Sequence, residues 1–238
     1  MKGKYINLIN QKDGFTVVEL MIATAVFSIV LLLSLAGFLQ IGQMFYKGVN
    51  ITQTSNVLNQ TATSLKNDIL FDTGTEAVTI FETPRITTPD GQITRYYFCA
   101  GSNRYSFIKG KQLDRAAGEA EINGPNGSDL WYQFALLKDR LTTSGCPNPF
   151  STTSSAPIDP DNVTELLGDK MRLSQLEIPR LPSPNDKLYT VFIKVAYGDN
   201  EVLTDSDLPS ASCKQTQVYS KYCFVSEIKT TARKGLDP

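Results

Sequence analysis

Residues 15–46 constrain this chain more than any other stretch, because they are apolar almost throughout and carry a single charge, Glu19. No proline interrupts them. A membrane-spanning helix needs about 20 consecutive apolar residues, so the stretch is long enough to cross a bilayer. The lysines that precede it, Lys2, Lys4 and Lys12, favour a cytoplasmic location for the N-terminal side. The rest of the chain is therefore expected outside the cytoplasm.

Glu19 is the unusual residue of this stretch. A carboxylate within an apolar helix costs about 2–3 kcal/mol or more in a membrane unless it finds a partner, and a simple anchor has no use for it. Gly14 is followed by Phe15, and Glu19 stands at the fifth place after the glycine. This arrangement resembles the class III signal that opens type IV pilins and the pseudopilins of type II secretion systems.

The resemblance implies a processing pathway and a role for the acid. In that family the prepilin peptidase cuts after the glycine on the cytoplasmic face, and the new N-terminal residue is methylated. By resemblance the cut falls between Gly14 and Phe15, and Phe15 becomes the methylated terminus. Glu19 corresponds to the family's acid, whose implied partner is the positive N-terminal amine of a neighbouring subunit. Such an opposite charge would offset the cost of burial and fix the axial register between subunits.

Two other interpretations of the N-terminal stretch remain open. One is a membrane anchor that is never cleaved. The other is an ordinary secretory signal, because Ser34, Leu35 and Ala36 form a small-x-small cleavage pattern. Neither interpretation explains Gly14 and Glu19 together.

The helix is predicted to continue beyond the apolar stretch, from about residue 16 to residue 71. Apolar residues at helical spacing mark one face: Ile51, Leu58, Ala62, Leu65 and Ile69. This face is expected to pack on a globular domain, with Gly74 as a left-handed cap after the helix. The predicted organisation is a leader (1–14), a transmembrane or filament-core helix (15–46), an amphipathic half (47–73) and a β-rich domain (74–238).

After Gly74 the composition favours strands. The strands and turns expected from alternation and turn residues are 77–81, 93–99, a hairpin turn at 101–103, 104–108, 188–197, a turn at 198–200, 201–203 and 222–231. Residues 130–137, with Trp131, fit a strand or a short helix, and 163–167 fit a short helix capped by Asp161 or Asn162. Surface loops are expected at 116–129, 142–160 and 178–186. The predicted fold class is α+β, with a long N-terminal helix packed on an antiparallel sheet, as in pilins.

Four cysteines lie beyond the apolar stretch: Cys99, Cys146, Cys213 and Cys223. An even number in an exported domain favours two disulfides. A bond between Cys213 and Cys223 would close a short loop and leave Cys99 for Cys146, while the other two pairings stay open. A four-cysteine zinc site is disfavoured because no two cysteines have the C-x₂-C spacing.

Composition argues against most chemistries. The chain has no histidine, which excludes histidine-based triads and histidine metal ligands. Its net charge of −1 gives no electrostatic case for nucleic acid. The oxygen-rich stretch 199–207 lacks the spacing of an EF-hand and is expected to be a solvated turn rather than a calcium site. The aromatic residues of 96–107 are expected to pack in the sheet, and the basic tail of Lys229, Arg233 and Lys234 to be solvated. We predict neither enzymatic activity, nor a cofactor, nor a metal.

The predicted function is that of a structural subunit, a pilin with a lean to a minor one, in a type IV pilus-like filament. The alternatives are a minor pseudopilin of a type II secretion system and a membrane-anchored exported binding or adhesion domain that never polymerises. Expected partners are other pilin subunits, the prepilin peptidase, and the cytoplasmic membrane with its assembly platform. The protein is expected to span the cytoplasmic membrane once, with its C-terminal domain outside, and to lie in an extracellular filament or at the cell surface after assembly.

Overall fold

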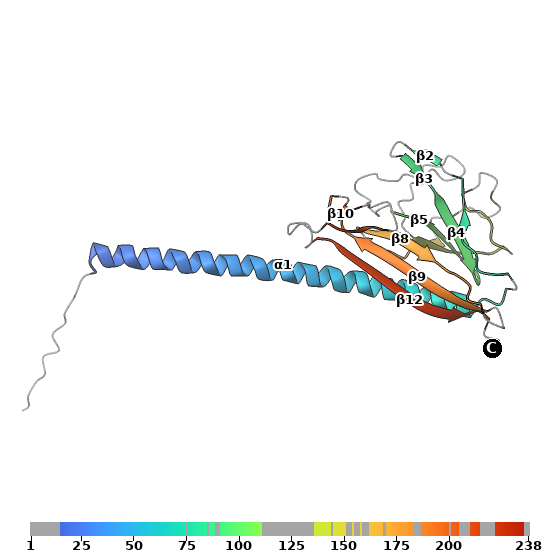
Figure 1. Cartoon of the computed structure of the whole chain (residues 1–238), viewed down its shortest axis with the longest axis horizontal. Helices are drawn as coiled ribbons and strands as arrows, with labels where there is room; N and C mark the ends of the chain where they lie inside the picture. The colour runs from blue at the N-terminus through green and yellow to red at the C-terminus, as the bar shows by residue number, and fades with distance from the viewer. Residues whose placement is uncertain are drawn as a thin grey trace, which may run out of the picture. The chain divides into compact units, whose positions relative to one another are not determined.

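The protein has an α+β fold in which one long helix is followed by antiparallel strands (Figure 1). The chain divides into two compact units, Met1–Phe45 and Tyr46–Pro238. The α+β, pilin-like fold class predicted from the sequence is confirmed. The computed structural model describes residues 15–74, 76–84, 86–88, 91–110, 136–143, 145–150, 154, 158, 162–168, 170–182, 187–199, 201–204, 210–214 and 222–235.

Helix α1 (Val17–Leu70) confirms the helix predicted from 16 to 71. No proline occurs within it, and its first half is rich in leucine, alanine and isoleucine. The face predicted to be buried in the second half is largely correct, since Leu58, Ala62, Leu65 and Ile69 are buried. Ile51 is only half-buried. The same face also buries two threonines that were not predicted, Thr54 and Thr61.

The prediction of a left-handed cap at Gly74 is wrong. The backbone φ of Gly74 lies outside the left-handed region. The helix ends at Leu70, and in the turn that follows the backbone N of Asp72 donates to the oxygen of Ile69 at 3.3 Å. The Asp72 carboxylate then accepts from the backbone N of Gly74 at 2.8 Å, so a side chain completes the turn.

The strands form two main antiparallel sheets rather than the single sheet that was predicted. The five-stranded sheet has the order β1 (Phe81–Glu82), β4 (Arg95–Ala100), β5 (Asn103–Ile108), β6 (Leu136–Arg140) and β7 (Val163–Glu165). The three-stranded sheet has the order β12 (Phe224–Arg233), β9 (Leu188–Tyr197) and β8 (Met171–Glu177). Two short ladders pair β2 (Ile86–Thr88) with β3 (Gly91–Ile93), and β10 (Leu203–Thr204) with β11 (Ser212–Cys213).

Strands with regular alternation or a clear turn were predicted correctly. Strand β9 spans the predicted residues, and its inward side chains are buried as expected: Tyr189, Val191, Ile193 and Val195. The β4–β5 hairpin turns at Gly101, whose φ of +61° favours glycine. Strand β12 lies close to its predicted range.

Other predictions fail for identifiable reasons. The strand predicted at 77–81 forms only at its last residue, in β1. Residues 163–165 form strand β7 instead of starting a helix, because they pair with β6. Strand β8 was not predicted: a bulge between Leu173 and Gln175 breaks its alternation. Trp131 and Asp161 lie outside the described residues, as do the predicted loop 116–129 and the other residues of 130–135.

The core of the second unit lies between the second half of α1 and the two main sheets. Leu65 and Ile69 of α1 belong to one buried cluster with Phe98 and Phe107 of the larger sheet and Ile193 of the smaller one. Strands β9 and β12 run beside the C-terminal part of α1 (Figure 1). Each large side chain buried in this way contributes about 1.5–3 kcal/mol, so the helix is an integral part of the domain.

Candidate functional site

The start of α1 holds Glu19 in a reciprocal pair with Thr16. The backbone N and the hydroxyl of Thr16 both donate to Glu19 Oε2 at 2.9 Å, and the backbone N of Glu19 donates to Thr16 Oγ1 at 3.2 Å. This is a capping box, in which the residue before the helix and the third helical residue satisfy each other's free N–H groups. The Thr-x-x-Glu pattern before an apolar run is the sequence signal of a capping box, and our sequence prediction did not include it.

The capping box changes how the acid of the apolar stretch is understood. Within the described part of the chain, hydrogen bonds reach only one carboxylate oxygen of Glu19, Oε2. The carboxylate also lies in the first turn, where the helix dipole favours a negative charge. The subunit can therefore hold Glu19 in place by itself and still present Oε1 to a partner. Phe15 is 86 % exposed beside it, and Gly14 lies outside the described residues.

The first half of α1 exposes apolar side chains on all sides. Val18, Leu20, Phe27, Leu32 and Phe38 are examples, each more than half exposed. Of the helices in the described part of the chain, α1 alone is long and apolar enough to cross a membrane. A helix that is apolar all round requires an apolar environment outside its own chain.

The second half of α1 has an exposed face that is polar but uncharged. The sequence contains no charged residue between Lys47 and Lys66. From Thr52 to Thr63 the exposed residues carry amides or hydroxyls, and we call them the neutral face: Thr52, Gln53, Asn56, Asn59, Gln60 and Thr63. Amides and hydroxyls cost less to remove from water than charges do, so this face is better suited to burial in an assembly than an ordinary exposed helix.

Polar contacts along the buried face of the second half of α1 link the helix to the sheets. Thr61 Oγ1 donates to the backbone oxygen of Leu166 at 3.2 Å, and Lys138 Nζ donates to Ser64 Oγ at 3.1 Å. Further along, Asp68 Oδ2 accepts from the hydroxyl of Tyr105 at 2.5 Å and pairs with Lys138 Nζ at 2.7 Å. Burial raises the pKa of Tyr105, and so do its hydrogen bond to Asp68 and the negative charge of that residue. The helix is thus fixed in its axial position as well as buried.

The last of these polar contacts corrects a prediction about the C-terminal tail. Lys234 was expected to be solvated, but it is buried and its Nζ lies 2.9 Å from Asp72 Oδ2. The same amine donates to the backbone oxygen of Glu76. A cation from the end of β12 therefore meets the C-terminal end of α1, where the helix dipole favours positive charge. The neighbouring Lys229 and Arg233 are exposed, as predicted.

The four cysteines form the two pairs that were favoured, Cys99 with Cys146 and Cys213 with Cys223. The described residues contain no cluster of three or more side chains that could hold a metal. In the oxygen-rich stretch, Asp199 pairs with Lys170 at 3.5 Å, while residues 200 and 205–207 lie outside the described part. The aromatic residues of β4 and β5 pack in the sheet as predicted, with Tyr96 stacked on Phe107 at 5.2 Å.

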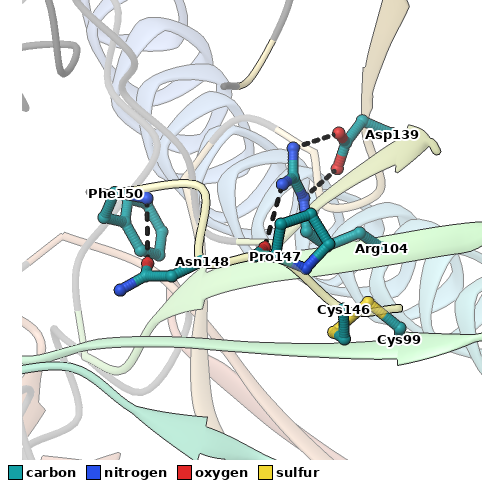
Figure 2. Close-up of polar contacts among 7 residues, drawn as sticks. All are labelled: Cys99, Arg104, Asp139, Cys146, Pro147, Asn148 and Phe150. Carbon is teal, nitrogen blue, oxygen red and sulfur yellow. Dashed lines mark hydrogen bonds and ion pairs between the residues drawn. A yellow bond between two sulfur atoms is a disulfide. The ribbon is translucent and has the colours of Figure 1, made fainter. Parts of the chain in front are cut away.

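The Cys99–Cys146 bond is one of three contacts that hold residues 146–150 on the outer face of the larger sheet. Arg104 is fully buried and donates through Nη1 to the backbone oxygen of Pro147 at 3.1 Å (Figure 2). Its guanidinium also forms a two-point pair with Asp139, at 3.2 Å from Nε to Oδ1 and 2.5 Å from Nη2 to Oδ2. The guanidinium of Arg95 lies 4.5 Å from the ring centre of Phe150.

This arrangement fixes a loop that the sequence predicted only as a surface segment. A buried arginine is tolerated when its charge and its N–H groups are matched, and Arg104 has both an acid and a carbonyl. Sequence reasoning did not single out Arg104 or Asp139. Their facing positions on β5 and β6, which bring them together, are known only once the strand register is known.

Comparison with known proteins identifies the N-terminal stretch and nothing beyond it. Residues 9–35 match the family model described as the prokaryotic N-terminal methylation motif. No curated protein and no solved structure matches the chain. The matched residues include Phe15, the capping pair of Thr16 and Glu19, and the first turns of the exposed apolar helix. The chain therefore carries the prokaryotic N-terminal methylation motif, the class III signal of type IV pilins and pseudopilins.

Proposed function

We propose that this protein is a structural subunit, a pilin, of a type IV pilus-like filament. The observation that carries the proposal is the methylation motif placed on a helix that exposes apolar side chains all round. The motif is the class III signal of type IV pilins and pseudopilins, which are structural proteins rather than enzymes. A helix of this kind leaves lipid readily only when other apolar surfaces receive it.

Processing is the first step of the proposal. The prepilin peptidase cuts between Gly14 and Phe15 while the chain lies in the cytoplasmic membrane, and Phe15 is then methylated. The mass of the N-terminal peptide from protein purified out of its native cell tests this step. A peptide that begins at Phe15 with one added methyl group is expected. An intact Met1, or a terminus at Gly37, would remove the filament function.

Assembly is the second step. The apolar side chains of the first half of α1 pack against the same helices of neighbouring copies. Lipid tails are as apolar as leucine, so close packing rather than removal from water stabilises this contact as the helix leaves the membrane. The neutral face extends the surface that neighbours can cover, because it adds no charge as far as Lys66. The globular unit with its two sheets forms the outside of the filament.

Glu19 sets the register in this proposal, and a pair of substitutions separates its charge from its capping bonds. Glu19→Gln keeps the capping box, since glutamine is also favoured at that position, but removes the charge. Glu19→Ala removes both. If the charge acts through a neighbour's N-terminal amine, both variants remain in the membrane fraction. In both, the amount of subunit found in sheared filaments falls at least tenfold.

The matched control is Thr16→Ala, which removes the capping hydroxyl and leaves the charge of Glu19. It is expected to assemble close to the normal level. Normal assembly of Glu19→Gln would contradict the register role and assign Glu19 to helix capping alone. Loss of assembly in Thr16→Ala together with normal assembly of Glu19→Gln would lead to the same conclusion.

A further inference from the structure

Strand β12 forms an edge of the three-stranded sheet and pairs with β9 on its other side (Figure 1). It is 10 residues long and contains neither proline nor glycine. Its residues pair one to one with those of β9, so no bulge bends the strand. Edge strands are commonly kept short, bulged or interrupted by proline, because an open edge readily pairs with another chain. Strand β12 has none of these three protections.

The backbone groups on the open side of β12 belong to alternate residues. The backbone N of Lys234 donates to the oxygen of Lys187 at 2.7 Å and continues the register of the β12–β9 ladder by one residue. In an antiparallel ladder, successive residues point their N–H and C=O groups in turn at the partner strand and away from it. The even-numbered residues of β12 therefore bond to β9, and five others point their backbone groups away: Val225, Glu227, Lys229, Thr231 and Arg233. Within the described part of the chain, no group bonds to these outward N–H and C=O groups.

The side chains along this edge carry charges in an order that matches a reversed copy of the same strand. Glu227 and Lys229 are both exposed and flank Ile228. When a second β12 runs antiparallel with its Ile228 facing this Ile228, each Glu227 lies opposite the other copy's Lys229, and each Val225 opposite Thr231. Opposite charges that face each other across a ladder stabilise it, and like charges destabilise it. A shift of two residues in either direction would bring Glu227 to Glu227 or Lys229 to Lys229, so charge selects the register centred on Ile228.

The centre of this register is apolar on the inner side of the sheet. Ile228 is half-buried and packs against the core of the globular unit. Residues that face each other without exchanging hydrogen bonds bring their side chains closest, and the two Ile228 side chains would form such a pair. Pairing would therefore cover apolar surface that a single subunit leaves exposed, in addition to satisfying the outward backbone groups.

We propose that β12 pairs edge to edge with β12 of a second copy, antiparallel and centred on Ile228. The two three-stranded sheets then form one continuous sheet across a two-fold axis. Strand β12 runs beside the C-terminal part of α1 (Figure 1), so the axis reverses that part of the helix as well as the strand. Neighbours within one filament have their helices in the same direction. If the proposed function holds, this contact therefore joins subunits of two filaments that run in opposite directions, whereas the pairing itself needs no filament.

Analytical ultracentrifugation tests the pairing on the full chain, held in lipid nanodiscs with one copy in each. Low salt is used because exposed charges are screened at higher ionic strength. The unaltered protein is expected to join discs in pairs. Lys229→Glu places acids opposite each other at both charged positions, and Glu227→Lys places lysines there, so each is expected to weaken pairing at least tenfold. A mixture of the two variants restores opposite charges between unlike copies and is expected to pair as tightly as the unaltered protein.

A backbone variant and two controls complete the test. Thr231→Pro removes an N–H that points away from β9, so it is expected to weaken pairing at least tenfold and to leave the β12–β9 ladder in place. Lys66→Glu makes the same charge change at an exposed position of α1 and is expected to pair normally. Glu19→Ala, which is expected to block filament assembly, should also pair normally, so the two proposals can fail separately. All variants are expected to unfold at similar temperatures.

Four results would overturn the proposal. They are discs that stay single, normal pairing of Lys229→Glu, normal pairing of Thr231→Pro, and a mixture of Lys229→Glu with Glu227→Lys that fails to pair.

Discussion

The two halves of α1 combine composition and burial in opposite ways. The first half is almost wholly apolar and exposes its side chains, whereas the second half is rich in threonine, asparagine and glutamine and buries most of one face. The more polar half is the one that completes a protein core. The apolar half must therefore find its environment outside the chain, first in lipid and, under our proposal, in other copies. Hydrophobicity along a helix thus indicates which environment a segment needs, and not whether its own chain supplies it.

Removing a leucine from each half tests this contrast with the largest effect. Leu65 is fully buried, and Leu65→Ala is expected to lower the free energy of unfolding of the globular unit by about 2–5 kcal/mol, because it leaves a cavity. Leu32 is 67 % exposed, and Leu32→Ala is expected to leave that free energy unchanged. Chemical denaturation of both variants, each held in lipid nanodiscs, gives the comparison. Equal losses would show that the first half also stabilises the domain.

Neutralising an acid in each half tests the same contrast, with a smaller expected change in the free energy of unfolding. Asp68 bonds to Tyr105 and Lys138. Asp68→Asn is expected to lower the free energy of unfolding by about 1–3 kcal/mol, because the buried Tyr105 and the partly buried Lys138 both lose a charged partner. Glu19→Gln retains the capping box and should have no measurable effect on the same unfolding transition. A loss in Glu19→Gln comparable to that of Asp68→Asn would contradict the separation of the halves.

Alkaline pH is expected to change the free energy of unfolding least. Because burial raises the pKa of Tyr105, the unfolded chain loses this proton before the folded chain does. The contribution of Tyr105 is complete below about pH 10 and is lost as pH rises further, by about 1.4 kcal/mol for each pH unit. Tyr105→Phe is expected to flatten the fall of unfolding free energy between about pH 10 and 11. An unchanged slope in that variant would show that this contact does not carry the alkaline sensitivity of the second half.

What could be predicted from the sequence depended on whether a pattern was local. The long helix, strand β9 and the β4–β5 hairpin each follow from periodicity or a turn glycine, so they were predicted within a few residues. Strand β8 could not be recognised because it is buried on both faces and bulged. Strand β7 looked helical in isolation, and only its pairing with β6 makes it extended.

The residues of the candidate site likewise fall into those with a local sequence pattern and those that only the fold brings together. The motif around Glu19 is contiguous and was visible at once, and the Thr16–Glu19 capping pattern was equally available. Arg104 and Asp139 are thirty-five residues apart in sequence, so their pairing required the register of β5 and β6. The same holds for Lys234, which looked like a free tail until β12 brought it to the end of α1.

The placement of the disulfides determines how a subunit responds to force. Helix α1 contains no cysteine, and both crosslinks join parts of the β region. Apart from the backbone that leaves its C-terminal end, the helix would therefore pass tension into the sheets through noncovalent contacts, from Leu58 to Asp72. These contacts are spread along the axis, so a pull loads them in shear and together rather than one after another. Mechanical failure would begin as sliding of the helix against the sheets, at a force that reducing agents leave unchanged.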